Sequence, residues 1–563
     1  MFDYCVSSYS GPGTMTETLI ETTASAYSYP LLIKHILDTP LASGTTQEIV
    51  YRDLKRYNYQ TLRERVGRLA SGLARLGVQP GDTVAMMDWD SHRYLECFFA
   101  VPMMGAVLQT VNVRLSPEQM LYTLNHAGAK IVLVNAKFFP ILDQIRNKFE
   151  SVRAFVLIED GLDISKGAIP FASEYERMLE SADPDYEFPD FDENTRATTF
   201  YTTGTTGLPK GVYFSHRQLV LHTLALLAVF GLQPGQGRFH RDDVYMPITP
   251  MFHVHAWGFP FAATMAGIKQ VYPGHYAAET LLALKQNEGV TFSHCVPTVL
   301  QMLLNSTAAK DFAFAGWKII IGGAALPTSL AKAALARGID VFSGYGMSET
   351  CPLLTLAHLR SPLPDTDEEV ALRVKSGLPL PLVTLRIVDE DMRDVDHDGK
   401  ATGEVVVRTP WLTQGYLHNT TASEQLWAGG YLHIGDIGTI SGDGYLQVTD
   451  RIKDVIKSGG EWISSVAIED LILRHPAVNE AAVIGMPDAK WGERPLALIV
   501  TKHEFAGKLC ADDIKGHIRD YANKGAISKL AIPEHIQFVD ALERTSVGKL
   551  NKKAMREKYC YPG

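Results

Sequence analysis

The stretch Thr202-Thr203-Gly204-Thr205-Thr206-Gly207-Leu208-Pro209-Lys210-Gly211 combines hydroxyls, glycines and one lysine. Glycine lets the backbone turn tightly and present its N–H groups to an anion. The hydroxyls add short donors and the lysine adds a positive charge, so the stretch fits a polyphosphate. It is not a Walker A loop, in which the lysine follows glycine and precedes Ser or Thr. Because Gly, Pro and Thr are common loop residues, the stretch by itself also fits a solvated loop.

Three further segments of unusual composition follow in order along the chain. They are Tyr345–Thr350 (Tyr-Gly-Met-Ser-Glu-Thr), Asp450–Asp454 (Asp-Arg-Ile-Lys-Asp) and Ser546–Lys549 (Ser-Val-Gly-Lys). The ordered set resembles the adenylate-forming superfamily, which includes acyl-CoA synthetases, peptide-synthetase adenylation domains and beetle luciferases. The resemblance runs from about Pro30 to about Tyr559 and is strongest to bacterial medium- and long-chain fatty-acyl-CoA synthetases.

Length and charge limit the classes of function. A chain of 563 residues is too long for one core, and a length of this order predicts about two to four folding units. The chain has 53 Lys and Arg against 63 Asp and Glu, a net charge of −10, which argues against nucleic acid as a partner. The apolar run Leu219–Leu232 is too short to span a bilayer and contains His222, so it predicts a buried helix. We therefore expect no integral membrane association.

The cysteines and the N-terminus indicate a cytoplasmic protein. The six cysteines are scattered, without a Cys-x-x-Cys pair, and this predicts free thiols in a reducing compartment. Residues 1–14 lack the basic and apolar regions of a signal peptide. Met15 could be the natural start, and we assign residues 1–29 to an N-terminal extension.

Short β-branched segments alternate with segments of helical periodicity. The expected strands include Thr83–Met87, Lys130–Val134, Ala154–Ile158 and Lys318–Ile321, and Ser91–Met104 is an expected helix. This alternation predicts an α/β fold with largely parallel sheets. Ligands in such folds bind beyond the carboxyl ends of the strands, where the glycine-rich motifs of this chain fall.

The pattern changes in the second half of the chain. Short strands separated by Asp and Gly turns between Leu385 and Tyr445 predict a small antiparallel barrel or sheet. A compact α+β unit follows. The resemblance implies a large AMP-binding domain at 30–449, a hinge at 450–453 and a mobile C-terminal domain at 454–563, with Asp450 and Lys453 as the hinge residues.

The resemblance also implies a nucleotide site assembled from these motifs. Its ATP- and AMP-binding residues would be Thr202, Thr203, Gly204, Thr205, Thr206, Lys210, Gly323, Ala324, Ser343, Gly344, Tyr345, Gly346, Ser348, Asp436 and Arg451. Asp436 would accept hydrogen bonds from both ribose hydroxyls, since one carboxylate can accept two. The family usually has Thr where Ile434 stands, which removes one polar contact but leaves Asp436 in place.

Three residues are candidates for the chemistry itself. By resemblance, Glu349 would hold Mg²⁺ with phosphate oxygens and water, a ligand set that suits this ion. Lys549 would bridge the substrate carboxylate and the α-phosphate, where its charge offsets that of the transition state. His253 would lie near the substrate carboxylate.

The remaining candidates concern CoA and the acyl group. The resemblance implies that Lys549 withdraws after adenylation and that a loop of the C-terminal domain then helps to form a pantetheine tunnel. The predicted CoA-binding residues are Ser458, Gly459, Gly460 and Trp462. The predicted acyl pocket consists of Val254, Trp257, Phe259 and Met347, although the same apolar residues are equally good core material.

The resulting prediction is an AMP-forming acyl-CoA ligase that uses ATP, Mg²⁺ and CoA, with a medium-chain fatty acid as the expected substrate. A short, branched, aryl or sulfur-containing acid such as methylmercaptopropionate remains open. So does a non-catalytic nucleotide-binding scaffold or sensor, although intact Glu349, Asp436, Arg451 and Lys549 argue against one. A homodimer is compatible with the resemblance.

Overall fold

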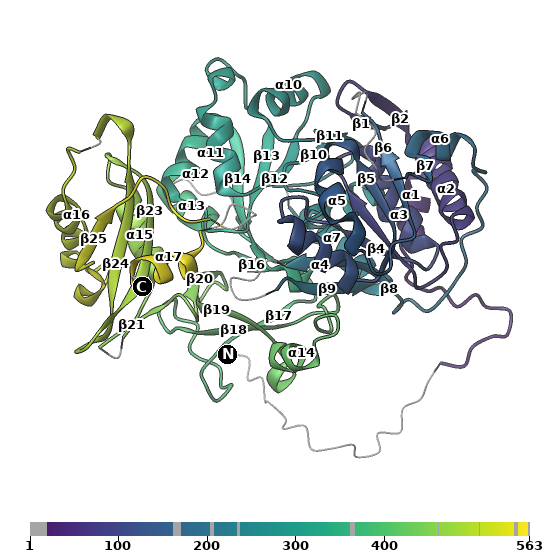
Figure 1. Cartoon of the computed structure of the whole chain (residues 1–563). Helices are drawn as coiled ribbons and strands as arrows, with labels where there is room; N and C mark the ends of the chain where they lie inside the picture. The colour runs from purple at the N-terminus through teal and green to yellow at the C-terminus, as the bar shows by residue number, and fades with distance from the viewer. Residues whose placement is uncertain are drawn as a thin grey trace.

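Two largely parallel sheets form the main body of the chain (Figure 1). The computed structural model describes residues 20–160, 170–202, 208–233, 237–360, 366–459, 461–505, 507–544 and 550–560. The parallel sheets, with helices against them, confirm the predicted α/β class. The predicted extension at 1–29 falls mostly outside the described residues.

The first sheet has seven strands and carries the phosphate-type motif at one edge. Its strands, in spatial order, are β7 (Ser173–Glu174), β6 (Ala154–Ile158), β5 (Ala129–Asn135), β3 (Thr83–Met87), β4 (Val107–Thr110), β8 (Arg196–Thr202) and β9 (Lys210–Ser215). Neighbouring strands pair in parallel, except that β9 returns antiparallel to β8. The glycine-rich motif therefore begins at the end of β8 and ends at the start of β9, two paired antiparallel strands at the edge of the sheet.

The second sheet has nine strands and is parallel at its centre. Its strands, in spatial order, are β16 (Leu378–Pro379), β15 (Leu353–Leu356), β14 (Ile339–Gly346), β13 (Trp317–Ile321), β12 (Phe292–Cys295), β10 (Val244–Pro247), β11 (Lys269–Tyr272), β1 (Glu48–Tyr51) and β2 (Lys55–Asn58). Pairing from β14 to β1 is parallel, and the outer pairs are antiparallel. The carboxyl ends of β13 and β14 lead directly into glycine-rich segments.

Helices cover both sheets of the main body. They are α1 (Lys34–Ala42), α2 (Tyr59–Arg75), α3 (His92–Met103), α4 (Pro117–His126), α5 (Phe139–Ile145), α6 (Tyr175–Glu180), α7 (His216–Gly231), α8 (Val254–Trp257), α9 (Phe259–Ala266), α10 (Ala278–Glu288), α11 (Pro297–Asn305), α12 (Thr328–Ala336) and α13 (Thr366–Arg373). The hydroxyl of Ser91 accepts from the Tyr94 N–H and caps α3, as expected for serine at this position. Ser215 and Gln218 form a capping box at the start of α7.

Helix α7 contains most of the apolar run predicted to be a buried helix. Leu219, Leu226 and Phe230 are almost completely buried, whereas Leu224 and the following Leu232 are exposed. The helix prediction is thus confirmed. Within the described ranges, no helix combines the length and hydrophobicity needed to cross a bilayer.

The antiparallel segment forms a four-stranded sheet. Its strands are β17 (Thr384–Val388), β18 (Gly403–Arg408), β19 (Leu432–Ile440) and β20 (Leu446–Arg451), and α14 (Thr420–Leu426) lies between β18 and β19 in sequence. The two outer strands, β17 and β20, do not pair with each other in the described structure. The sequence predicted either a small barrel or a sheet, and the described strands form a sheet that is not closed into a barrel.

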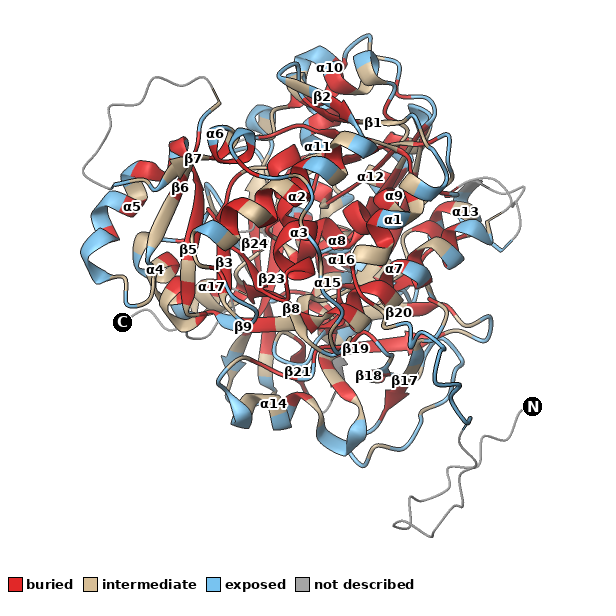
Figure 2. Cartoon of the chain, turned by 90° about the vertical axis from the view of Figure 1, so that its right-hand side faces the viewer, coloured by how far each residue is buried: buried red, intermediate tan, exposed pale blue. Residues whose placement is uncertain are grey.

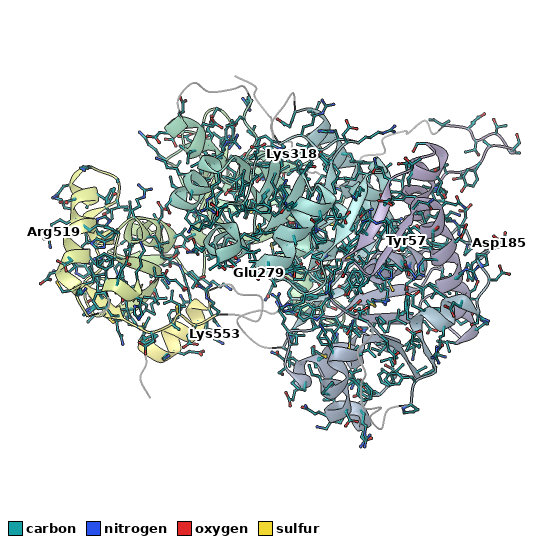
Figure 3. All side chains as sticks on the ribbon, turned by 90° about the horizontal axis from the view of Figure 1, so that it is seen from above. Tyr57, Asp185, Glu279, Lys318, Arg519 and Lys553 are labelled. Atoms are coloured by element: carbon teal, nitrogen blue, oxygen red, sulfur yellow. The ribbon has the colours of Figure 1, made fainter. Side chains whose placement is uncertain are left out.

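The C-terminal unit is built on a separate sheet (Figure 3). It contains β21 (Ile456–Ser458), β22 (Glu461–Ile463), β23 (Val478–Asp488), β24 (Gly492–Thr501), β25 (His535–Phe538), α15 (Ser465–Leu473), α16 (Ala511–Asn523) and α17 (Lys552–Tyr559). The long hairpin of β23 and β24 forms its centre. Seen from above, Arg519 and Lys553 lie on this unit, away from Tyr57 in the main body.

Buried residues are concentrated in the interior of the molecule (Figure 2), and the buried apolar residues form separate clusters before and after the expected boundary. The largest core cluster extends to Leu446, and the C-terminal clusters begin at Ile456. Each unit thus has its own core, which is what a domain requires. This division is consistent with the predicted domain limits around residues 450–453.

Candidate active site

The phosphate-type hairpin lies at the edge of the seven-stranded sheet. Thr202 is the last residue of β8, and it pairs with Lys210, the first residue of β9. Thr203, Gly204, Thr205 and Thr206 lie outside the described residues. The pairing of β8 with β9 nevertheless defines the position of Lys210, which is exposed at the start of β9.

The second motif follows β14 directly. Ser348, Glu349 and Thr350 form the short helical turn η4 (Ser348–Thr350). Glu349 is only 5% exposed. Its carboxylate Oε1 accepts a hydrogen bond from the Tyr416 hydroxyl at 2.7 Å, and its backbone oxygen accepts from the Thr413 N–H at 3.0 Å. The motif therefore presents one carboxylate that is already oriented by a neighbouring loop.

The same tyrosine also contacts the lysine of the hairpin. Lys210 Nζ lies 4.5 Å from the centroid of the Tyr416 ring, within the range of a cation–π interaction. Two motifs that are far apart in sequence thus converge on one side chain. Sequence reasoning missed Tyr416, because a tyrosine after a glycine carries no signal of its own.

A second carboxylate lies beyond the end of β14. Asp436 on β19 is 9% exposed, and its Oδ2 accepts from the Tyr345 hydroxyl at 2.7 Å. Arg451 pairs with Asp436 across β19 and β20, and its Nε lies 3.5 Å from Asp436 Oδ1. Burial, followed by the charge of Asp436, raises the pKa of Tyr345, so its hydroxyl remains a donor. These three predicted nucleotide residues are brought together.

The remaining predicted nucleotide residues lie beside them. Gly323 and Ala324 follow β13 and are exposed, and Gly323 has a left-handed φ of +76°. Ser343, Gly344 and Gly346 lie on the adjacent strand β14. Within the described structure the buried Ser343 hydroxyl has no hydrogen-bond partner. Ser343 pairs with Ile321, the last residue of β13, so this unpaired buried hydroxyl lies beside the end of β13, where a ligand with polar edges could satisfy it.

The segment after His253 adopts an unusual backbone. Val254, His255, Ala256 and Trp257 all have positive φ, at 48°, 55°, 47° and 59°, so α8 is a left-handed turn. Each non-glycine residue in this region costs about 1–2 kcal/mol. Strain of this kind persists only where surrounding contacts hold it, and it is concentrated at functional sites.

A buried aspartate holds the start of this turn. Asp90, which follows β3, accepts from the Met251 N–H at 2.8 Å and from the Tyr276 hydroxyl at 2.5 Å. Burial raises the pKa of Asp90 to about 7. Asp90 was not predicted as a site residue, and it connects the two parallel sheets at the position of His253.

The turn directs Trp257 towards the strand ends of the nine-stranded sheet. The Trp257 ring stacks on His294 at 4.9 Å, and a Cβ added to Gly322 would lie 2.8 Å from the ring. Gly322 immediately precedes the predicted adenine residue Gly323, so Trp257 borders the nucleotide region. The Phe259 ring also stacks on His294, at 5.0 Å.

The other members of the predicted acyl pocket are less informative. Val254 is buried in the main core, and the half-buried Met347 packs against that core from the second motif. Phe259 is enclosed by other rings, including Phe230 and Phe292. The acyl pocket therefore stays a prediction, and Trp257 is its best-placed member.

The predicted CoA loop lies on the C-terminal unit. Ser458 is fully buried near Arg494, and Gly459 has a φ of +59°. A Cβ at Gly459 would lie 2.8 Å from the Trp491 ring, so this position requires glycine. Gly460 and the side chain of Trp462 lie outside the described residues. Trp491 was not predicted and packs directly against the loop.

The predicted hinge residues connect the two units. Asp450 lies one residue before the end of β20 and pairs with Ile437, and its Oδ2 accepts from both the N–H and the hydroxyl of Ser465 at the start of α15, at 2.6 Å each. Asp450 thus belongs to both units. Lys453 is exposed in the turn between β20 and β21. The catalytic candidate Lys549 lies outside the described residues.

Comparison with known proteins decides the family. Residues 42–417 match the AMP-binding enzyme family and residues 467–549 match its C-terminal domain. The chain belongs to the AMP-binding enzyme family. A long-chain-fatty-acid–CoA ligase of Thermus thermophilus is 41% identical and covers 91% of this chain and 93% of its own length. A 3-methylmercaptopropionyl-CoA ligase of Ruegeria lacuscaerulensis is 38% identical over 94% of this chain and 97% of its own.

The fold of this AMP-binding enzyme is shared with solved structures. A crystal structure of an anthranilate CoA ligase in complex with anthranoyl-AMP gives a TM-score of 0.82 at 22% identity, covering 94% of this chain and 98% of that chain. At this identity the likeness shows the fold. The relatives confirm the predicted superfamily and the predicted reaction class, that of an AMP-forming acyl-CoA ligase.

Proposed function

We propose that this AMP-binding enzyme activates a fatty acid of medium chain length. The observation that carries the proposal is the position of Trp257, which borders the nucleotide region at Gly322 while lying in an uncharged segment. No Arg, Lys, Asp or Glu occurs between Val254 and Met265. A pocket built from this segment accepts an uncharged tail and disfavours amino acids and dicarboxylates.

In the first half-reaction, a carboxylate oxygen of the acid attacks the α-phosphorus of ATP, and pyrophosphate leaves. Catalysis consists mainly of alignment and charge stabilisation. Lys210 and the hairpin hydroxyls would hold the β- and γ-phosphates, Asp436 and Arg451 the ribose. Lys549 would offset the charge between the carboxylate and the α-phosphate.

Glu349 is the residue that fits Mg²⁺. Among the described residues no group of three or more His, Cys, Asp or Glu could hold a metal ion. One carboxylate with phosphate oxygens and water suits Mg²⁺, which retains much of its hydration. Glu349, whose carboxylate is oriented by the Tyr416 hydroxyl, would supply that carboxylate. When bound, the ion would neutralise phosphate charge.

In the second half-reaction, the CoA sulfur attacks the adenylate carbonyl, AMP leaves, and the thiol proton is released. The loop of Ser458, Gly459, Gly460 and Trp462 would line the path of the pantetheine arm. Gly459 supports this role because it lets the backbone approach closely.

A panel of acids tests the proposal. AMP release should depend on both acid and CoA, and each additional buried methylene should add about 0.8 kcal/mol until the pocket is full. The specificity constant should therefore rise from acetate through butyrate to hexanoate or octanoate. A preference for acetate, or for methylmercaptopropionate over all fatty acids, would refute the medium-chain assignment. ADP release instead of AMP would contradict the reaction class.

Replacement of Trp257 should change the chain-length optimum. Trp257→Ala removes the ring that stacks on His294 and touches Gly322, so the pocket gains length and the optimum should move to longer acids. Trp257→Phe is the graded control and should move the optimum less. The measurement is kcat/KM across the acid panel. An unmoved optimum would place the pocket elsewhere.

A rigid residue at the hinge should uncouple the two half-reactions. Lys453→Pro fixes φ near −65° and removes a backbone donor. If the C-terminal unit rotates about this residue, one half-reaction should survive and the other should fail, and Lys453→Ala should retain both. Pyrophosphate exchange reports the first, and conversion of a synthetic acyl-adenylate reports the second. An unchanged overall rate would show that rotation here is unnecessary.

A further inference from the structure

Tyr416 lies where three segments of the chain meet. It belongs to the loop between β18 and α14, and it forms an isolated bridge with Val212 of β9. The neighbouring Leu417 N–H donates to the Gly211 oxygen at 2.8 Å. The loop is thus attached to the strand that leaves the phosphate hairpin (Figure 1). Its tyrosine then reaches the second motif at Glu349.

The hydroxyl of Tyr416 acts on the carboxylate. The residue is 9% exposed, and its hydroxyl donates to Glu349 Oε1 at 2.7 Å. Hydrogen bonds to ionised acceptors are short and strong, so this one fixes the orientation of the carboxylate.

The ring of Tyr416 acts on the lysine. Lys210 Nζ lies 4.5 Å from the ring centroid, and such contacts favour a cation placed over an aromatic face. Through its ring and its hydroxyl, Tyr416 thus contacts both the ammonium group of Lys210 and the carboxylate of Glu349.

The loop does not need the tyrosine hydroxyl for its own fold. Thr413 anchors it independently: its N–H donates to the Glu349 oxygen at 3.0 Å, and its hydroxyl donates to the Tyr213 oxygen at 2.9 Å. The Tyr416 N–H is satisfied by the Ser423 hydroxyl at 2.9 Å. Removal of the phenolic oxygen alone should therefore leave the backbone of the loop in place.

We propose that Tyr416 is a positioning residue for adenylation, whose hydroxyl orients Glu349 for the metal and whose ring holds Lys210 for the phosphates. This inference rests on the proposed function, since it requires Glu349 to hold Mg²⁺ and Lys210 to face the triphosphate. The two contacts come from different parts of one side chain, and substitution can separate them.

Two substitutions and one control test the inference. Tyr416→Phe removes only the hydroxyl, and Tyr416→Leu removes the hydroxyl and the ring. Tyr445→Phe is the matched control, because the buried Tyr445 hydroxyl donates to the His358 oxygen at 2.7 Å and neither residue belongs to the motifs. Pyrophosphate exchange into ATP is measured against Mg²⁺ concentration. ATP binding without acid is titrated in the same way, which needs no turnover.

The expected result separates the variants. Loss of a residue that orients a metal ligand typically costs about 10- to 100-fold in metal affinity. Tyr416→Phe should raise the Mg²⁺ concentration for half-maximal exchange by a factor in that range, with the KM for the acid unchanged and activity largely recovered at saturating Mg²⁺. Tyr416→Leu should in addition weaken ATP binding at saturating Mg²⁺. Tyr445→Phe should retain the native Mg²⁺ dependence.

Other outcomes overturn the inference. A native Mg²⁺ dependence in Tyr416→Phe would show that the hydroxyl does not orient Glu349. A loss that is equal at all Mg²⁺ concentrations, accompanied by a lower melting temperature, would show a structural role. The native protein could fail to exchange pyrophosphate with any acid of the panel and still bind ATP in a way that depends on Mg²⁺ and on Tyr416. In that case the proposed function would be wrong, whereas the positioning role of Tyr416 would stand.

Discussion

Lys549→Ala should abolish acyl-adenylate formation and spare thioester formation. The residue is proposed to offset the charge that develops between the carboxylate and the α-phosphate, and removal of one such group typically costs about 10²–10³ in rate. It would be absent from the site when CoA attacks, so a synthetic acyl-adenylate should still give acyl-CoA. Pyrophosphate exchange measures the first reaction, and thioester formation from the synthetic adenylate measures the second.

Lys553 offers a matched control for this lysine. It lies four positions later on α17 (Figure 3), its side chain is 39% exposed, and it forms an ion pair with Glu557 of the same helix at 3.5 Å. Lys553→Ala should retain both half-reactions. If Lys549→Ala reduced both half-reactions to the same extent, the proposal that the lysine withdraws between them would be wrong.

The elements of the main body could be predicted because each carries a local pattern. The strands at Thr83–Met87 and Ala154–Ile158 form with the expected bounds, and the helix expected at Ser91–Met104 forms as His92–Met103, with Ser91 as its cap. Such segments can be recognised in the sequence from their hydrophobic periodicity and their capping residues. The open form of the four-stranded sheet could not be predicted, because strand closure depends on pairing between distant segments.

The residues of the candidate site also divide into those that a local motif predicts and those that depend on contacts between distant segments. Tyr345, Asp436 and Arg451 were expected from motifs, and the structure brings them together. Tyr416 and Asp90 were not expected, because each acts through a contact with a segment far away in sequence. A motif can identify a residue that touches a ligand, whereas the residues that position it become visible only when the chain is folded.

Replacement of Asp436 should weaken nucleotide binding. Asp436→Ala would remove charge-assisted hydrogen bonds to the ribose, a loss of about 1.5–3 kcal/mol for a bond to a charged group. That energy corresponds to about a 10- to 160-fold weaker affinity for ATP. The Tyr345 hydroxyl and the Arg451 guanidinium would also lose their shared acceptor, so the effect on binding should exceed that of a simple surface substitution. Equilibrium binding of ATP and of AMP measures the change.

An aspartate in the connection between β17 and β18 provides the comparison. Asp394 accepts from Arg386 Nε at 2.6 Å and is 51% exposed, so Asp394→Ala removes an aspartate–arginine pair without touching the nucleotide region. ATP affinity should be unchanged in that variant. Asp436→Asn retains the shape and one acceptor, and its loss should fall between those of the native protein and Asp436→Ala. AMP and ATP should weaken by similar factors, because they share the ribose. If ATP alone weakened, Asp436 would act on the phosphates and the ribose assignment would be wrong.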